Sequence, residues 1–196
     1  NIGYFPEISV FWESRIIQIY NWFIDKELST KDPIKDRKTE VLGKISFLAG
    51  NKNFTLTAVA DRIDIMENGN LLIIDYKTGT IPSGKEVEAG FSPQLPLEAV
   101  IASNGGFSNI KQSNSIQLEY WRVRGGNNPG EVVRPSENIV KLQEDALKGL
   151  KHLVEIYQDQ ETPYPSRPNP SYAPQYSDYE HLARVREWST FAKRSK

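Results

Sequence analysis

The alternation of apolar and polar residues divides the first part of the chain into one helix and three strands. From Ser9 to Lys26 the apolar residues recur at the three- and four-residue spacing of an α-helix, with Ser9 as a plausible N-cap. A polar, lysine-rich connector follows over Lys31–Lys38. The next segments are rich in Thr, Val, Ile and Leu and are bounded by turn residues, which is typical of strands. We therefore expect strands over Thr39–Leu48, Phe54–Met66 and Leu71–Thr78.

Capping signals predict helices and one further strand in the second part of the chain. Ser83 and Glu86 have the spacing of a capping box, which opens a short helix that ends near Gly90. Ser92-Pro93 predicts a second helix, with the serine as N-cap and the proline at the first helical position, where its missing N–H costs nothing. That helix should end near Ser103. We also expect a strand over Ser115–Arg124 and a helix from Glu137 to about Gln158. An irregular Pro-rich stretch should follow over Pro163–Pro174, and a last helix over Tyr179–Trp188.

This order of elements predicts the fold class and the domain organisation. A helix, three strands, two helices, a strand and further helices favour an α/β protein with a mixed central β-sheet flanked by helices. The length of 196 residues fits one domain of moderate size. We expect a single domain over 1–196, with a core over 37–124 and with the C-terminal helices and Pro-rich segment over 137–196. Because residue 1 is not an initiator methionine, we interpret the chain as a fragment of a longer protein.

Composition and charge exclude several classes of site. The chain has no cysteine, so it has no disulfide, no thiolate zinc site and no cysteine-ligated iron–sulfur cluster, which is compatible with a cytoplasmic setting. No apolar run approaches the roughly eighteen residues that a membrane span needs, so we expect no membrane partner. The net charge of -1 and the pI of about 6.2 do not indicate a nucleic-acid binder. DNA binding would therefore need a local basic stripe or a neighbouring domain.

The hairpin formed by the second and third expected strands carries the richest candidate chemistry. Side chains alternate between the two faces of a strand, so Asp75 and Lys77 share one face while Tyr76 lies on the other. Charged side chains that follow the apolar run Leu71–Ile74 are costly to bury unless they are paired or bind a metal. This pattern indicates a functional site rather than an ordinary core strand.

The turn of this hairpin decides which upstream residue lies opposite Asp75. A two-residue Asn68-Gly69 loop would set Arg62 opposite Asp75. A three-residue loop, with Gly69 in the left-handed position of a bulge, would set Asp61 opposite Asp75 instead.

We expect the three-residue loop, because it explains the charges on both faces of the hairpin. Asp61 and Asp75 would then face each other at ~5 Å between Cβ atoms, where two carboxylates repel unless a cation sits between them. Hard oxygen ligands with an open coordination sphere suit Mg²⁺ or Mn²⁺. We therefore predict that Asp61 and Asp75 are metal ligands and that Arg62 and Asp64 can pair on the opposite face.

The hairpin and the helix after it resemble the PD-(D/E)XK nuclease core of the RecB and AddB families. In these families an aspartate in a D-R-x-D-like stretch is followed by D-Y-K and then by a glutamine that opens the next helix. Asp61 matches the first acid, Asp75-Tyr76-Lys77 matches the central motif, and Gln94 matches the helix glutamine. This combination is far more specific than D-x-K alone.

The resemblance covers essentially the whole chain and implies a restriction-endonuclease-like fold. The run Phe54–Phe107 resembles the AddB branch that lacks an iron–sulfur cluster, and Leu182–Ser189 resembles the C-terminal end of that branch. What the resemblance implies is a DNA nuclease domain of an AddB-like subunit in the cytoplasm. Such a subunit works with an AddA-like helicase–nuclease partner on double-strand DNA ends.

The resemblance also implies a role for each matching residue in Mg²⁺-dependent phosphodiester hydrolysis, with Mn²⁺ as a possible substitute. Asp61, Asp75 and the backbone carbonyl of Tyr76 would hold the metal. Lys77 would orient or deprotonate the attacking water and help to offset the developing charge. Gln94 would position the water or the phosphate near the N-terminus of its helix.

The sequence departs from the family pattern at two places. The tyrosine that usually follows the glutamine by four residues is Glu98 here; it could reach the site, but we interpret it as an exposed helix glutamate. The family also carries a further active-site residue, often histidine, on a helix near the start of the domain. No histidine precedes His152, so we expect that helix to lie before Asn1 and the site in this chain to be incomplete.

Two other functions compete with that of a nuclease. A catalytically silent module that keeps the nuclease fold and binds DNA or a partner subunit is favoured by the weak overall charge and by the missing helix. It is disfavoured by the intact acid–acid–lysine set, because a silent fold has no physical reason to keep repelling carboxylates. A small-molecule hydrolase lacks a supporting arrangement of serine, cysteine or histidine nucleophiles.

Overall fold

The structure is a computed structural model that describes residues 6–29, 32–165, 181, 182 and 184. The chain forms two compact units, Asn1–Glu155 and Ile156–Lys196. In the second unit the rings of Tyr157 and Tyr164 stack with their centroids 4.6 Å apart. The first unit contains the sheet and every candidate site residue.

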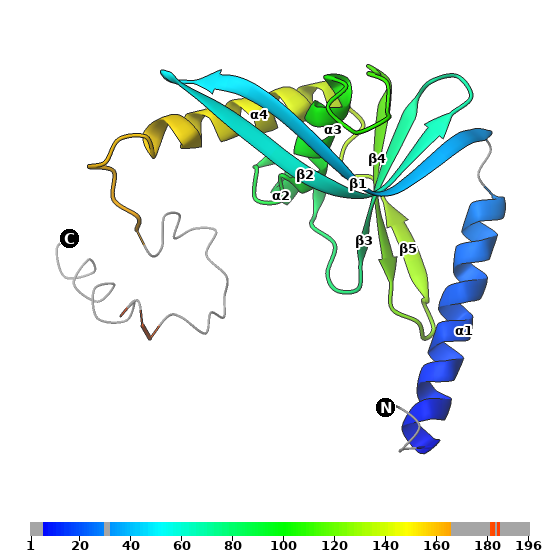
Figure 1. The fold of residues 1–196 in the computed structure, drawn as a ribbon. Helices are drawn as coiled ribbons and strands as arrows, with labels where there is room; N and C mark the ends of the chain where they lie inside the picture. Colours follow the sequence, from blue (N-terminus) through cyan, green and yellow to red (C-terminus); the bar gives the residue numbers. More distant parts are fainter. Residues whose placement is uncertain (1–5, 30–31, 166–180, 183, 185–196) are drawn as a thin grey trace. The chain divides into compact units, whose positions relative to one another are not determined.

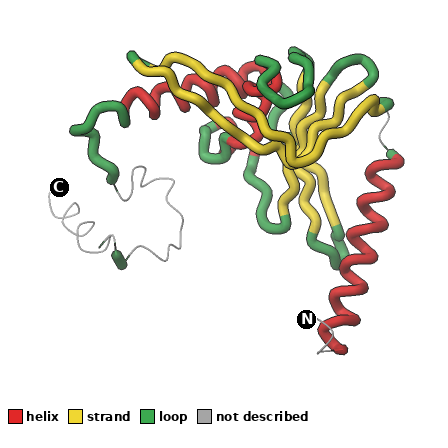
Figure 2. The backbone as a smooth tube through the Cα atoms, viewed as in Figure 1, coloured by secondary structure: helices red, strands yellow, loops and turns green. Residues whose placement is uncertain are grey.

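A five-stranded mixed sheet forms the centre of the first unit (Figures 1 and 2). Its strands follow the chain in the order β1-β2-β3-β4-β5; β3 and β4 run parallel, and the other neighbours are antiparallel. The parallel pair requires a crossover, which the helices between these two strands provide. This arrangement confirms the predicted α/β class with a mixed sheet. The elements are α1 (Pro6–Leu28), β1 (Ile34–Ala49), β2 (Lys52–Met66), β3 (Leu71–Lys77), α2 (Gly84–Glu88), α3 (Gln94–Ser103), β4 (Ile116–Val123), β5 (Gly130–Val133) and α4 (Ile139–Ile156).

Helices cover the two faces of the sheet with separate apolar clusters. On one face the sheet packs against α3, with contributions from α2 and α4; this cluster includes Ile63, Ile73, Leu118, Val87, Leu95, Ala99 and Leu142. On the other face Trp22 and Phe23 of α1 pack edge-on against Trp121, with ring centroids 5.8 and 5.7 Å apart. Burial of large aromatic rings is strongly stabilising, so Trp121 anchors α1 to the sheet.

Two strand segments differ from the sequence-based expectation. Residues 34–38, which we expected to form a connector, belong to β1 and pair with the end of β2. Because β1 is an edge strand, its lysines remain in water while its backbone completes the ladder. The four-residue strand β5 was not expected, since Gly130–Val133 is too short to show an alternating pattern.

The helix signals were confirmed in part. The capping box at the start of α2 is present, with both the Ser83 and the Glu86 side chain bonded to the other residue's backbone N–H. The helix expected over Tyr179–Trp188 lies outside the described residues except for 181, 182 and 184, which are in turns. Within the described part of the chain, no helix combines the length and the apolar character that crossing a membrane would require.

A buried ionic network joins the α1 side of the sheet to α1 itself. Arg62 and Asp64 of β2 are 2% and 0% exposed, and Nε of Arg62 donates to Oδ1 of Asp64 at 2.8 Å, so the predicted pairing is confirmed. Arg37 of β1 also donates to Asp64, and Glu27 of α1 accepts from both arginines. The Tyr76 hydroxyl accepts a further bond from Arg62 at 3.1 Å. Two cations and two anions therefore balance on this face.

The network changes the ionisation of Asp64. Burial alone would raise the pKa of Asp64, but the hydrogen bonds and charges of Arg62 and Arg37 outweigh burial and hold this pKa below its ordinary value. A carboxylate with a lowered pKa contributes stability that is present above its unfolded-state pKa and is lost as the pH falls.

We predict that Asp64→Asn lowers the free energy of unfolding by about 3–5 kcal/mol at neutral pH, because it removes the buried carboxylate that pairs with Arg62 and Arg37 and leaves Glu27 alone to balance both arginines. The difference from wild type should shrink as the pH falls below 3.8, the ordinary pKa of an aspartate. Denaturant unfolding measures both effects. The matched control is Asp36→Asn, whose exposed ion pair with Lys38 should contribute little. Equal losses in the two variants would contradict the prediction.

Candidate active site

The turn between β2 and β3 has the predicted three-residue form. The backbone N–H of Met66 donates to Asn70 O at 2.9 Å, and that of Gly69 donates to Met66 O at 2.9 Å. Gly69 has a φ of 83°, in the left-handed region that residues with a side chain rarely adopt. The ladder continues from this turn through the pair Ile63↔Ile73, in the register that we expected.

The β2–β3 ladder ends at Arg62↔Ile74, immediately before the two candidate metal ligands. One further step in the same register sets Asp61 opposite Asp75. There the carboxylate of Asp61 accepts a hydrogen bond from the backbone N–H of Tyr76 at 2.9 Å. A side-chain oxygen thus takes the place of a ladder acceptor, and the two strands separate at the level of the acids.

The neighbouring strand β1 is irregular at the same level. Thr39↔Arg62 and Val41↔Ala60 are paired, but Glu40 and Asp61 between them are not. Glu40 has a φ of 49°, which is uncommon for a residue with a side chain and stores local strain. The irregularity frees Asp61 from the ladder on both sides.

Asp75 and Lys77 lie on the α3 face at the end of β3, as their spacing predicted. Parallel pairing with β4 continues through Asp75↔Tyr120 and Lys77↔Arg122, which holds this end of β3 in the sheet. Asp75 is 2% exposed, and its Oδ1 accepts a hydrogen bond from Nζ of Lys77 at 3.0 Å. The Lys77 side chain is 31% exposed, so its ammonium group connects the buried acid with solvent.

The first residue of α3 completes this cluster. Gln94 directs its Oε1 toward Nζ of Lys77 at 3.4 Å, and its Nε2 donates to Oε1 of Glu98 at 3.2 Å. The expected N-cap was wrong by one position. Pro93 rather than Ser92 is the N-cap, because the Pro93 carbonyl already accepts the first helical bond; the helix therefore begins at Gln94.

Glu98 is buried, which corrects its interpretation as an exposed helix residue. Only 2% of its surface is exposed, because α3 packs into the apolar cluster over almost its whole circumference. The sequence carried a signal for this burial, since Leu95, Leu97 and the run Ala99–Ala102 leave α3 without a polar face. A single charged residue in such a helix is a candidate site residue.

Burial and mutual repulsion disfavour the ionised forms of two acids in this cluster. Burial raises the pKa of Asp75, and the charge of Asp61 adds to this effect while Lys77 opposes it. Burial also raises the pKa of Glu98 to about 7, with further contributions from the charges of Asp75 and Asp61. The α3 face therefore carries three carboxyl groups, whose full negative charge the single positive charge of Lys77 cannot balance.

The oxygen atoms of this cluster fit a hard divalent cation. Oδ2 of Asp75 and Oε2 of Glu98 are buried and accept no hydrogen bond within the described part of the chain, although Oδ2 lies 2.7 Å from Nζ of Lys77 in an ion pair. The described residues contain no group of three or more acidic, histidine or cysteine side chains suited to one metal ion. A cation would therefore rely on Asp61, Asp75 and a backbone carbonyl, with water or substrate as its other ligands.

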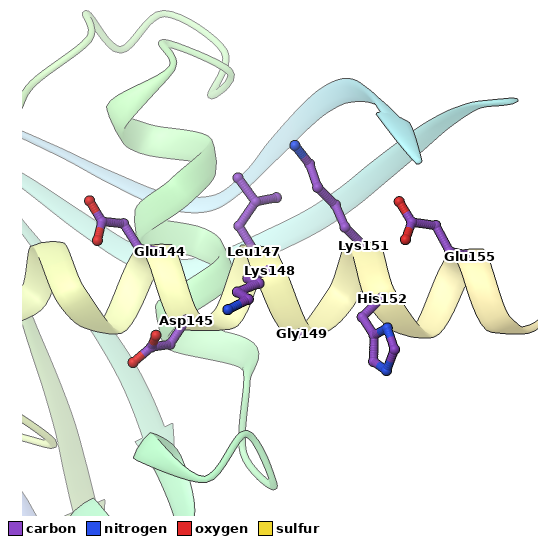
Figure 3. A pocket seen from close by; sticks show the side chains of 8 residues that line it. All are labelled: Glu144, Asp145, Leu147, Lys148, Gly149, Lys151, His152 and Glu155. Carbon is purple, nitrogen blue, oxygen red and sulfur yellow. The ribbon is translucent and has the colours of Figure 1, made fainter. Parts of the chain in front are cut away.

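A separate depression is lined by residues of α4 (Figure 3). All eight residues that line it belong to this one helix, and their side chains point to both sides of the helix rather than toward a common point. It shares no residue with the cluster of acids. Ligand sites need polar groups that converge, so we place the candidate active site at the acids and not at this depression.

Comparison with known proteins identifies the class. Residues 7–176 match the model of the PD-(D/E)XK nuclease superfamily, and the chain belongs to this superfamily. Nuclease activity and the use of divalent metal ions are typical of the class. The sheet with its flanking helices agrees with the restriction-endonuclease-like fold of the superfamily.

Particular relatives are known from Rickettsia. An uncharacterized protein of Rickettsia felis is 34% identical over 105 residues, which are 54% of this chain and 12% of that protein. The uncharacterized protein RT0391 of Rickettsia typhi is 32% identical over 130 residues, which are 64% of this chain and 15% of that protein. The chain thus spans a small part of the curated relatives it matches. The solved structure of SSO0001 aligns with 72% of this chain and 64% of its own, at a TM-score of 0.36 and 19% identity.

We predict that the metal-free domain loses stability as the pH rises from 4.5 to 7, in part because of Glu98. An acid with a raised pKa keeps its proton longer in the folded state, so folding weakens as the solution pH passes the unfolded-state pKa. In Glu98→Gln the loss of unfolding free energy over this pH range should be smaller by roughly 3 kcal/mol. Thermal unfolding in the presence of a chelator measures it, with the exposed Glu144→Gln as the matched control. Identical pH slopes in wild type and Glu98→Gln would contradict the prediction.

Proposed function

We propose that this chain is a metal-dependent DNA nuclease domain whose catalytic residues are Asp61, Asp75, Lys77 and Gln94. The observation that carries the proposal is the convergence of these side chains from β2, β3 and α3. The Lys77 ammonium group lies within 3.4 Å of both an Asp75 oxygen and the Gln94 amide oxygen, and the β2–β3 register sets Asp61 opposite Asp75. Membership of the nuclease superfamily supports the same chemistry.

Asp61, Asp75 and the Tyr76 carbonyl would hold Mg²⁺, or Mn²⁺ in its place. When bound, the ion supplies Lewis acidity that activates water and offsets the charge of the phosphate. The oxygen atoms are suited to it, since Asp75 has a buried oxygen without a hydrogen bond, and burial, with a smaller contribution from the charge of Asp61, raises the Asp75 pKa. The Tyr76 N–H holds the Asp61 side chain at this position.

Lys77 would act on the substrate from the solvent side of the cluster. Its ammonium group is partly exposed and is held by Asp75 and Gln94, so it is oriented before the substrate binds. In this position it would orient the attacking water and stabilise the charge that develops on the phosphate. Gln94 lies in the first turn of α3, where the helix N-terminus favours a phosphate.

The biological setting that we propose follows from the resemblance of the hairpin to the AddB family. The domain would act as an exonuclease-type enzyme at DNA ends during double-strand-break repair, in the cytoplasm and together with an AddA-like helicase–nuclease subunit. The chain matches 12–15% of the length of its Rickettsia relatives. Such a domain would rely on other parts of a larger protein for much of its DNA affinity.

A catalytically silent module that binds DNA or a partner subunit is the second candidate. The net charge of -1 favours it, because a nuclease that works alone usually presents a basic surface to DNA. The two candidates differ in whether the acids bind a metal ion and in whether DNA is cleaved.

We predict that the domain degrades linear single- or double-stranded DNA with Mg²⁺ or Mn²⁺, and that Asp75→Asn and Lys77→Met each reduce the rate roughly 100-fold or more. Both changes preserve the approximate shape of the side chain, so the fold should survive. Gel electrophoresis of end-labelled DNA measures the rate, and Glu144→Gln on the exposed face of α4 should cleave at the wild-type rate. Unchanged cleavage in Asp75→Asn would exclude these residues as the catalytic centre.

We also predict that wild type binds Mn²⁺ or Mg²⁺ with a stoichiometry near one and that Asp61→Asn and Asp75→Asn abolish this binding. Each substitution removes a charged oxygen ligand without changing the size of the side chain. Isothermal titration calorimetry measures the binding without requiring DNA or activity. A silent module predicts no binding in wild type, so the titration separates the two candidates.

A further inference from the structure

We propose that Glu98 is a positioning residue, which holds the Gln94 side chain in the one orientation that turns its carbonyl oxygen toward Lys77. The inference rests on the proposed nuclease function for its catalytic consequence, but its structural part can be tested alone. The residues concerned form a chain of hydrogen bonds from the core to the site, from Glu98 through Gln94 and Lys77 to Asp75.

The amide group of Gln94 has two ends with opposite hydrogen-bonding properties. Its NH₂ end donates to Oε1 of Glu98 at 3.2 Å, and this bond leaves its carbonyl end facing Nζ of Lys77 at 3.4 Å. In the flipped orientation the NH₂ group would face the ammonium group of Lys77, and both would be donors. The flip would also set the carbonyl oxygen of Gln94 against an oxygen of Glu98. The acceptor on Glu98 therefore selects the orientation.

Glu98 can hold Gln94 in place because Glu98 is buried and immobile whereas Gln94 is exposed. Gln94 is exposed, and a free glutamine side chain loses conformational entropy when it is held in one rotamer. Glu98 lies one helical turn away on the same face of α3 and is 2% exposed, so the surrounding apolar cluster already immobilises it. The buried residue thus orders the exposed one.

The cost of burying Glu98 supports a functional reason for its presence. A buried carboxyl group is unfavourable unless partners compensate for lost hydration. Among the described residues Glu98 has no ion-pair partner, its Oε2 accepts no hydrogen bond, and its one hydrogen bond leads to Gln94. A residue selected for stability alone would be apolar here, as its neighbours on α3 are. The carboxylate form of Glu98 can only accept hydrogen bonds, so this form selects the orientation of Gln94.

Steady-state kinetics with linear DNA and Mg²⁺ tests the catalytic consequence. Glu98→Gln has the same shape, but its amide can accept or donate, so it permits both orientations of Gln94. We expect kcat to fall roughly 10-fold with KM for DNA unchanged. We expect Gln94→Ala to lower kcat at least as much, and the double variant to be no slower than Gln94→Ala alone. Glu144→Gln, on the exposed surface of α4, should match wild type.

Two kinetic results would overturn the proposal. A wild-type kcat in Glu98→Gln would show that the orientation of Gln94 does not depend on Glu98. Full additivity of the losses in the double variant would show that Glu98 acts through the fold rather than through Gln94.

NMR relaxation of the Gln94 side-chain amide tests the positioning without any activity. The resonance is assigned by its loss in Gln94→Ala. We expect an ordered amide in wild type and a mobile one, with an order parameter below about 0.6, in Glu98→Leu, which fills the same volume without an acceptor. Equal mobility in both proteins would overturn the proposal. If wild type does not cleave DNA, the nuclease proposal fails, while the relaxation data still decide whether Glu98 positions Gln94.

Discussion

The pairing register of β2 with β3 is the constraint on which the rest of this domain depends. Side chains alternate along a strand, so a slip of one residue would move every side chain to the opposite face. Gly69 at the turn, with its φ of 83°, sets the observed register. In this register Asp61 and Asp75 face α3, while Arg62 and Asp64 face α1. The register that this one glycine sets therefore directs the candidate site residues to one face of the hairpin and the ionic network to the other.

The two faces of the hairpin use charge in opposite ways. On the α1 face two arginines balance Asp64 and Glu27, and the network ties β1, β2 and α1 together. On the α3 face the acids outnumber the lysine, and burial together with the neighbouring acids raises the pKa values of Asp75 and Glu98. The face with balanced charges favours stability. The other face keeps carboxylate oxygens whose excess negative charge a divalent cation would neutralise. Tyr76 belongs to both, since its hydroxyl bonds Arg62 and its N–H bonds Asp61.

The cluster at the acids also combines side chains that reach solvent with buried supports. Lys77 is partly exposed and Gln94 is exposed, but each bonds a residue that is 2% exposed, Asp75 in one case and Glu98 in the other. Functional groups that reach solvent lose precision unless buried neighbours hold them. Membership of the PD-(D/E)XK nuclease superfamily gives the general chemistry of such a cluster, and the buried glutamate on α3 adds a further polar group beside it.

The sequence by itself determined the features that depend on near neighbours along the chain. The capping box at Ser83, the turn at Gly69 and the alternation of Asp75 with Tyr76 need only a few adjacent residues, and from them followed the hairpin register and the pairing of Arg62 with Asp64. Tertiary structure decided the early start of β1, the existence of β5 and the contacts of the buried Glu98, although the apolar sequence of α3 already carried a signal for that burial. Each of these depends on partners distant in sequence, because backbone pairing with β2 or β4 and the packing of α3 against the sheet override weak local preferences.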